Sequence, residues 1–261
     1  MGKLLKFEFR KVFRLKYFYI IAAAAIAFII LNGLVAYLLW FFSSKLPGEA
    51  QEAIAASIPP GTSYNFVKGT IGNNFFTFAG IFLAIFACED NSHGTTKNII
   101  GKGFNRVQVF YSKYIASLIL VLLMALLGFI ASTTFSLIAY GPNTFQNDDN
   151  LLLIIIGQLL ALVAYHALLF VISYSIGKPG GAVAVCIVVP LAMPLVLMAL
   201  DVVLKTNDPY KFEAFWLDGI ISNFTGNKTN YDLVKWDYPL LIAYLALANV
   251  IGLVFARRKQ Y

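Results

Sequence analysis

The sequence predicts an all-α integral membrane protein, and three observations support this class. Of the 261 residues, 59% are hydrophobic and only 13% are charged, whereas a soluble domain carries about 25% charged residues. The mean hydropathy is +0.75. Apolar stretches long enough to cross a bilayer, which takes about 20 residues, recur along the chain. A water-soluble globule of this composition would leave too much apolar surface exposed.

Six stretches qualify as membrane-spanning helices, and we interpret residues 1–261 as a single transmembrane domain. The first run follows a basic N-terminus and is too long for the core of a signal peptide, so we expect it to be retained. The third run exceeds what a bilayer requires, so it is expected to tilt or to project into water. The predicted spans are Tyr17–Phe42, Val67–Ala87, Gln108–Tyr140, Leu151–Ile176, Gly181–Leu204 and Tyr238–Ala256.

The basic residues are distributed unevenly between the two sides of this arrangement. With the N-terminus inside, 14 of the 20 Lys and Arg residues and three of the 13 acids lie on the cytoplasmic side, which gives that side a net charge of +11 and the outer side −4. Because an excess of cytoplasmic Lys and Arg sets the orientation of membrane proteins, both termini are predicted to be cytoplasmic. Topology therefore explains the overall charge of +7 without a nucleic-acid partner.

The N-terminal segment, residues 1–16, has the pattern of an amphipathic helix. Such a helix lies in the headgroup plane, with its apolar face toward the lipid and its cations near anionic headgroups. A plainer interpretation is a basic flank that only sets topology. The apolar positions are Leu5, Phe9 and Val12, and the cations are Lys3, Lys6, Arg10 and Arg14.

The segment between the second and third spans is the longest polar interruption in the first half of the chain. Glu89 and Asp90 lie where the apolar run stops. They can end the span while a following residue caps the next helix, and they can form a salt bridge that fixes the loop against the third span. The candidate caps are Asn91 and Ser92, and the candidate salt-bridge partners are Lys97 and Arg106.

Two further segments carry local structural signals. The tight turn from Gly177 to Gly181 predicts that the fourth and fifth spans are antiparallel neighbours, and Pro190 and Pro194 predict a kink in the fifth span. In the outer segment 205–237, the stretch FEAFWLDGIISNF has apolar residues at helical spacing. It predicts one short amphipathic helix that dips into the outer interface.

The sequence shows no hydrolytic, redox or metal-binding constellation. Ionisable side chains within a membrane are functional candidates by default. The candidates are His166, near the middle of the fourth predicted span, and Asp201, near the outer end of the fifth. We interpret His166 as a neutral side chain bonded to a neighbouring helix. The alternative is that His166 is one weak member of a proton relay. Cys88 and Cys186 are interpreted as small apolar residues. The short run Gly101-Lys102-Gly103 does not match the phosphate-binding loop motif of ATPases. We therefore expect that this chain does not hydrolyse ATP by itself.

At the loop after the second span, the sequence resembles the permease subunits of ATP-binding-cassette exporters of the ABC-2 type. Those proteins share with it an amphipathic N-terminal helix, six spans and cytoplasmic termini. The layout matches over nearly the whole chain, whereas the residue-level match is confined to this loop. One departure is Asn105 before Arg106, where the family often has serine; it affects only the fine contacts of the loop. The matching residues are Glu89, Gly94, Thr95 and Lys97, followed by Arg106 and Lys113.

The resemblance implies a half-transporter that forms a dimer, a homodimer in the first instance, and binds two separate ATPase subunits. ATP and Mg would be bound by the ATPase, with no cofactor, metal or catalytic residue in this chain. The loop around His93–Gly103 would be a coupling helix seated in a groove of the ATPase, with Ile99, Ile100 and Phe104 exposed to it. The implied coupling residues are Glu89, His93, Gly94, Thr95, Lys97, Ile99, Ile100, Phe104 and Arg106.

The substrate expectation comes from the same resemblance. Compact permeases of this kind are similar to those of bacteriocin-immunity and peptide-toxin systems, which implies export of amphipathic peptides or other hydrophobic compounds across a bacterial plasma membrane. Polar residues inside the spans are the candidates for lining the path, although Asn73 and Asn74 could equally serve helix packing. These candidates are Asn73, Asn74, Gln158 and His166.

Two rival functions remain open at the level of sequence. A secondary transporter driven by an ion gradient predicts transport without an ATPase and an essential role for His166 or Asp201. A non-transporting immunity or scaffold protein predicts that alteration of Gly94 or Ile99 leaves protection intact.

Overall fold

A computed structural model describes residues 2–14, 16–43, 45, 66–67, 69–70, 73–92, 94–141, 151–205, 211–225 and 231–258. All the regular elements in these ranges are α-helices, which confirms the predicted class. Five of them are long and apolar enough to cross a membrane, and a sixth span results if the bent pair α5–α6 is counted as one. The five are α2 (Lys16–Ser43), α7 (Arg106–Tyr140), α8 (Leu151–Ile176), α9 (Pro179–Leu204) and α12 (Tyr231–Arg258).

The helix ends differ from the prediction where polar residues extend a helix beyond its apolar run. The second predicted span appears as α5 (Asn73–Ser92), which begins and ends later than expected. The last span was predicted to begin at Tyr238, but α12 begins at Tyr231 and contains Pro239. A proline removes only one helical hydrogen bond, so it does not have to mark the start of a helix.

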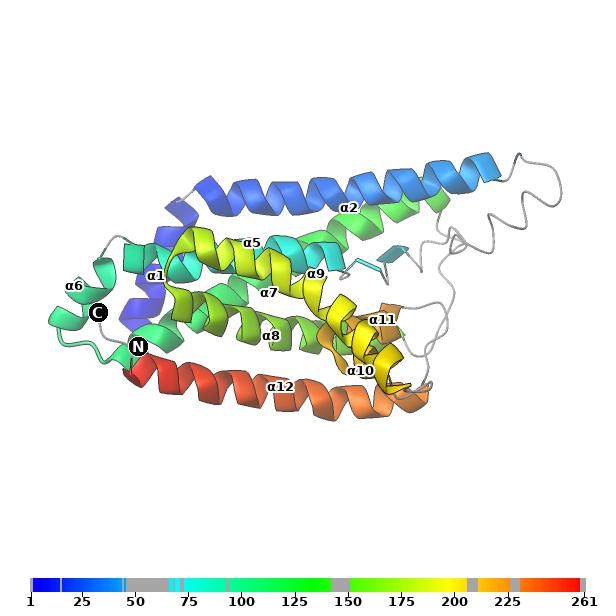
Figure 1. Cartoon of the computed structure of the whole chain (residues 1–261). Helices are drawn as coiled ribbons and strands as arrows, with labels where there is room; N and C mark the ends of the chain where they lie inside the picture. The colour runs from blue at the N-terminus through cyan, green and yellow to red at the C-terminus, as the bar shows by residue number, and fades with distance from the viewer. Residues whose placement is uncertain are drawn as a thin grey trace.

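The bundle is organised around α5, which packs against α8, α9, α2 and α7. Its side chains Phe76, Phe82 and Leu83 are fully buried. On the outside of the bundle, α2 packs against α7, and α12 packs against α8. Two short helices, α1 (Gly2–Arg14) and α6 (Thr95–Gly101), lie at one end of the bundle, close to both ends of the chain (Figure 1). We call this the α6 end.

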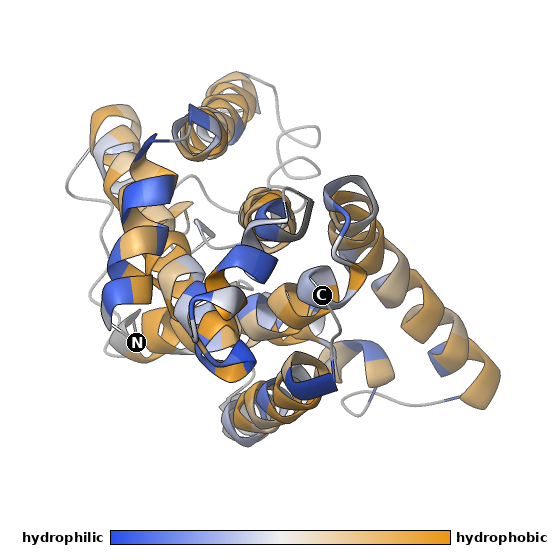
Figure 2. Ribbon diagram, turned by 90° about the vertical axis from the view of Figure 1, so that its left-hand side faces the viewer, coloured by the Kyte–Doolittle hydropathy of each residue, from blue (hydrophilic) through white to orange (hydrophobic). Residues whose placement is uncertain are grey.

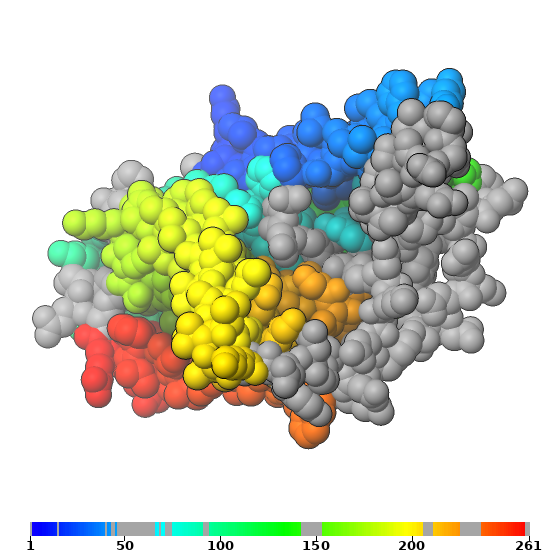
Figure 3. All heavy atoms as spheres, turned by 45° about the vertical axis from the view of Figure 1, so that its right-hand side comes forward, coloured from blue at the N-terminus to red at the C-terminus, as the bar shows by residue number. Residues whose placement is uncertain are grey.

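The turn between α8 and α9 has the predicted geometry. Gly177 adopts a left-handed conformation with φ 68°, and its N–H donates to the carbonyl oxygen of Ser173 at 3.0 Å. The two helices contact one another as neighbours. Pro190 and Pro194 lie inside α9, which stays continuous. The second half of α9 is mostly exposed and apolar, with Leu191 66% exposed, and the helix lies on the outside of the molecule (Figure 3).

The outer segment forms two helices instead of the one predicted. These are α10 (Phe212–Phe215) and α11 (Leu217–Thr225), separated by Trp216 in an extended conformation. Asp201, at the end of α9, contacts the start of the first of these helices. Its buried carboxylate accepts hydrogen bonds from the backbone N–H groups of Phe212 at 2.8 Å and Glu213 at 3.1 Å, so it caps a separate short helix.

Replacement of Asp201 with alanine is expected to lower the free energy of unfolding by about 1–3 kcal/mol, because two backbone N–H groups lose a charged acceptor. The apparent Tm of the purified protein in detergent measures this effect. Asp201→Asn is the matched control and should have a smaller effect, since its amide oxygen still accepts a hydrogen bond. An unchanged Tm in the alanine variant would show that the cap does not stabilise this segment.

Candidate coupling site

The helix α6 is set off from α5 by a glycine. Gly94 adopts φ 67° and ψ 7°, a left-handed conformation that glycine reaches without the strain other residues incur. The axes of the two helices differ by 55°. At the other end, Gly103 has φ 88° and donates its N–H to the carbonyl oxygen of Ile100 at 2.9 Å. Two glycines therefore bound the short helix.

The predicted N-caps of this helix are wrong. Asn91 and Ser92 are still part of α5, and Gly94 precedes α6 without a side-chain hydrogen bond. The reason is that α5 continues for two residues past Asp90, so the chain reverses only at the glycine. His93 lies outside the described residues.

One face of α6 packs against the rest of the protein and the other is exposed. Ile99 is only 8% exposed and clusters with Leu4 and Val109, with Phe104 packed partly buried against them. The prediction that Ile99 is exposed to a partner is therefore wrong, because α1 covers it. The accessible face consists of Lys97 and Asn98, with Lys102 just after the helix and Ile100 half-buried. Viewed from this end, hydrophilic residues gather in front of the apolar helices (Figure 2).

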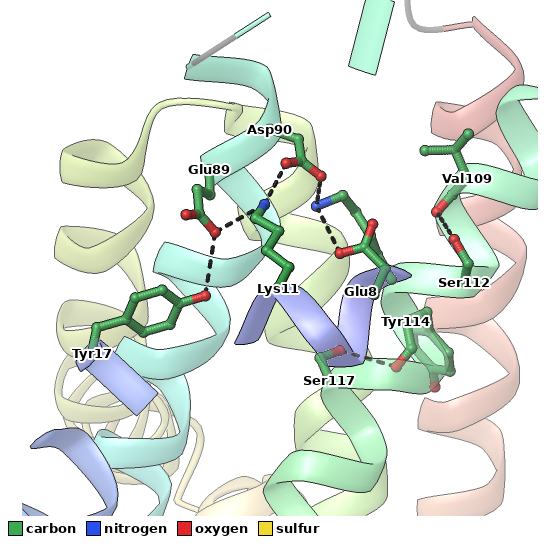
Figure 4. A network of polar contacts seen from close by, with 10 residues as sticks. Glu8, Lys11, Tyr17, Glu89, Asp90, Val109, Ser112, Tyr114 and Ser117 are labelled. Carbon is green, nitrogen blue, oxygen red and sulfur yellow. Dashed lines mark hydrogen bonds and ion pairs between the residues drawn. The ribbon is translucent and has the colours of Figure 1, made fainter. Parts of the chain in front are cut away.

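Beside α6, five ionisable side chains from three helices form an ionic cluster. Asp90 on α5 forms ion pairs with both Lys11 on α1 and Lys113 on α7. Lys11 also pairs with Glu89 at 3.0 Å, and Lys113 lies 3.8 Å from a carboxylate oxygen of Glu8 on α1. Figure 4 shows how these groups converge. We define the ionic cluster as Glu8, Lys11, Glu89, Asp90 and Lys113.

The centre of the ionic cluster is deeply buried. The side chains of Lys113 and Asp90 are 1% and 2% exposed, and the hydroxyl of Tyr17 on α2 donates to Glu89 at 3.3 Å. Burial alone would lower the pKa of Lys11, but the carboxylates of Asp90 and Glu89 raise it above its ordinary value. Lys11 therefore stays charged, and the cluster ties α1 to α5 and α7.

Sequence reasoning found only part of this cluster. It singled out Glu89 and Asp90, but it assigned Lys97 or Arg106 as the salt-bridge partner, whereas the partners of Asp90 are Lys11 and Lys113. Glu8 was missed because it lies on the face of α1 that was expected to meet lipid. The buried face of α1 consists of Leu4, Glu8 and Val12. One signal was present in the sequence: Lys113 lies seven residues inside a long apolar helix.

The polar residues proposed for a translocation path lie elsewhere. The ring of His166 on α8 is fully buried, with its Nε2 atom 2.8 Å from the hydroxyl oxygen of Ser117 on α7. The predicted bond to a neighbouring helix is therefore present, while the neutral state of His166 stays a prediction. Gln158 is also fully buried on α8, and Asn73 and Asn74 begin α5, with only their backbone described. Whether these four residues line a path stays a prediction.

The cysteines have the expected packing role. Cys88 and Cys186 are both buried thiols that form no disulfide. The thiol of Cys88 lies 3.1 Å from the carbonyl oxygen of Ser173, and the hydroxyl of Ser173 lies 3.3 Å from the sulfur of Cys186. They contribute to the contacts among α5, α8 and α9.

A comparison with protein families identifies the family to which the chain belongs. The fold defines a multi-pass helical membrane protein, and a family model described as "ABC-2 family transporter protein" matches residues 4–195. This match covers most of the chain and includes α1, the ionic cluster and α6. The chain therefore belongs to the ABC-2 family and is a permease subunit of an ABC transporter, which associates with an ABC ATPase at the membrane. No curated protein and no solved structure matches the chain.

Proposed function

We propose that the chain is the membrane-spanning half of an ATP-driven exporter, and that α6 is the element that receives force from the ATPase. The observation that carries this proposal is the position of α6, with one face exposed and the other packed against the protein. It lies at one end of the bundle with Lys97 and Asn98 exposed, while its other face is fastened to α1 and α7 through Ile99. A helix held in this way can contact a partner and still pass movement to the membrane helices.

The proposed orientation places the α6 end in the cytoplasm of a bacterial cell. Both chain ends lie there (Figure 1), together with the exposed cations of α1 and the exposed pair Arg257 and Arg258 on α12. This distribution agrees with the excess of basic residues expected on the cytoplasmic side. In this orientation α6 meets a cytoplasmic ATPase.

Two helices are placed to carry movement from α6. The chain passes directly from α5 through Gly94 into α6, and from α6 through Gly103 and Phe104 into α7. The ionic cluster joins the same two helices through Asp90 and Lys113. A displacement of α6 would therefore move α5 and α7 together. In this proposal the ATPase binds ATP and Mg, this chain has no catalytic role, and a second copy completes the membrane path.

The proposed substrates are amphipathic peptides or other hydrophobic compounds. Support comes from a crevice of about 330 Å³ between α2 and the start of α5, which is within the usual size range of small-molecule sites. Its walls include Phe28, Phe75 and Phe78, and polar groups are contributed by Asn32 and Thr70. This mixture of aromatic and a few polar groups suits an amphipathic compound better than a hydrated ion.

Reversal of the charge of Lys97 is expected to weaken binding of the ATPase by about tenfold at low salt, because a charge of the wrong sign at a contact site disfavours association. The experiment is affinity purification of the tagged chain from its host in mild detergent, with the ATPase quantified by mass spectrometry. Lys97→Glu is compared with Lys45→Glu, an exposed site at the opposite end of the bundle. Equal recovery of ATPase in both variants would argue against α6 as the contact.

A further inference from the structure

The carboxyl group of Glu8 has an unusual environment. Its side chain is fully buried where α1 packs against α7. Neither of its oxygens has a hydrogen-bond partner among the described residues, and the Nζ atom of Lys113 lies 3.8 Å from the nearer oxygen. Buried carboxylates that remain ionised are normally held by close cations and hydrogen bonds. Glu8 lacks that support.

The charges around Glu8 are already balanced without it. Lys113 makes its closer ion pair with Asp90, and Lys11 is shared by Asp90 and Glu89. These two ammonium groups and two carboxylates compensate one another. An ionised Glu8 would add a third negative charge to a buried group of only two positive charges, so a neutral carboxyl group is the form that fits.

The titratable groups near Glu8 come from four helices: α1 itself, α2, α5 and α7. Burial raises the pKa of Glu8, Lys113 opposes part of this effect, and the negative charge of Asp90 raises the pKa further. Neutral Glu8 is therefore favoured by both its burial and its surroundings. The surrounding groups are Lys113 on α7, Asp90 and Glu89 on α5, Lys11 on α1 and Tyr17 on α2.

We propose that the carboxyl group of Glu8 is a proton-binding site, occupied while α1 lies against α7 and emptied when α1 leaves it. Docking of α1 then takes up one proton. At a pH below the ordinary pKa of glutamic acid, both states hold the proton and docking is strongest. As the pH rises above that value, the equilibrium constant for docking of α1 falls by about tenfold per pH unit, until the pH reaches the higher pKa that Glu8 has in the docked state.

The position of α1 can be measured in the full-length protein in lipid nanodiscs. Spin labels at Lys6→Cys on α1 and Arg257→Cys on α12, both exposed positions, report the distance between these helices, in a background where the buried Cys88 and Cys186 are replaced with alanine. We expect the undocked fraction to rise with pH. In Glu8→Gln, whose amide stands in for the neutral carboxyl group, α1 should stay docked at every pH.

Two further variants make the test specific. Glu8→Leu is a second neutral replacement and should also remain docked. Glu89→Gln removes one carboxylate, which leaves the ionic cluster an excess positive charge; Glu8 can then ionise while docked, and the pH dependence should shrink. Release of α1 in both neutral variants would show that an ionised Glu8 holds the helix and would overturn the proposal. So would a pH-independent distance in the unmodified protein, or an undiminished pH dependence in Glu8→Gln.

Discussion

Replacement of Lys113 with methionine is expected to lower the free energy of unfolding by about 3–5 kcal/mol, because the carboxylates of Asp90 and Glu89 must then share the ammonium group of Lys11. The side chains of Lys113 and Asp90 are almost completely buried. Methionine has nearly the length of the lysine stem, so packing changes little and the loss reflects mainly charge. The apparent Tm in detergent measures the effect, and the exposed Lys16→Met on α2 is the matched control.

A second substitution should recover much of this loss. In the double variant Lys113→Met with Asp90→Asn, the buried charge is removed together with its partner, while Lys11 and Glu89 still compensate one another at 3.0 Å. Recovery is the result expected when stability depends on matched charges. If the double variant is as unstable as the sum of the two single variants, the Asp90–Lys113 pair does not act as a unit.

Substitution of Gly94 with proline is expected to abolish transport while the protein still inserts in the membrane. Proline is confined to φ near −65°, whereas Gly94 has φ 67°, so α6 cannot keep its present angle to α5. The measurement is ATP-dependent uptake of a fluorescent amphipathic peptide into inverted membrane vesicles that contain the ATPase. We expect a reduction to the level of vesicles without the protein.

Gly101→Ala provides the matched control for this experiment. Gly101 is within α6, and a Cβ atom added there would have no neighbour within 4 Å. Alanine also favours a helix by about 1 kcal/mol relative to glycine, so transport should be preserved. Full transport in Gly94→Pro would remove α6 from the proposed route of force.

The membrane helices could be predicted from sequence because lipid demands long uninterrupted apolar runs. The bounds of α8 match the prediction, and those of α2 differ from it by one residue at each end. The predicted helix ends were wrong where the chain leaves the lipid. Polar residues can continue a helix into water, as in α5 and at the start of α12, and hydropathy does not register that continuation. The carboxylate that caps the start of α10 belongs to Asp201, which lies in another helix, so this contact could not be inferred from local spacing.

The candidate site was only partly predictable for a related reason. The loop after the second span stood out as a polar interruption, and Gly94 and Lys97 could be placed within it. The partners of Asp90 could not, because Lys11 and Lys113 come from helices distant in sequence. Amphipathic spacing in α1 predicted the helix but assigned its apolar face to the lipid, whereas the burial of Leu4 and Glu8 depends on the contact with α7.

The length of α7 has a mechanical consequence. The helix is continuous over 35 residues, about 50 Å, whereas the hydrocarbon core of a bilayer is about 30 Å thick. Lys113 divides it into a short arm toward Arg106 and an arm about four times longer toward Tyr140. If α7 pivots as a rigid rod at the ionic cluster, a sideways displacement of roughly 1 Å at Arg106 would move the far end by roughly 4 Å in the opposite direction. In the proposed coupling, a small displacement at α6 would thus be magnified at the other surface of the membrane.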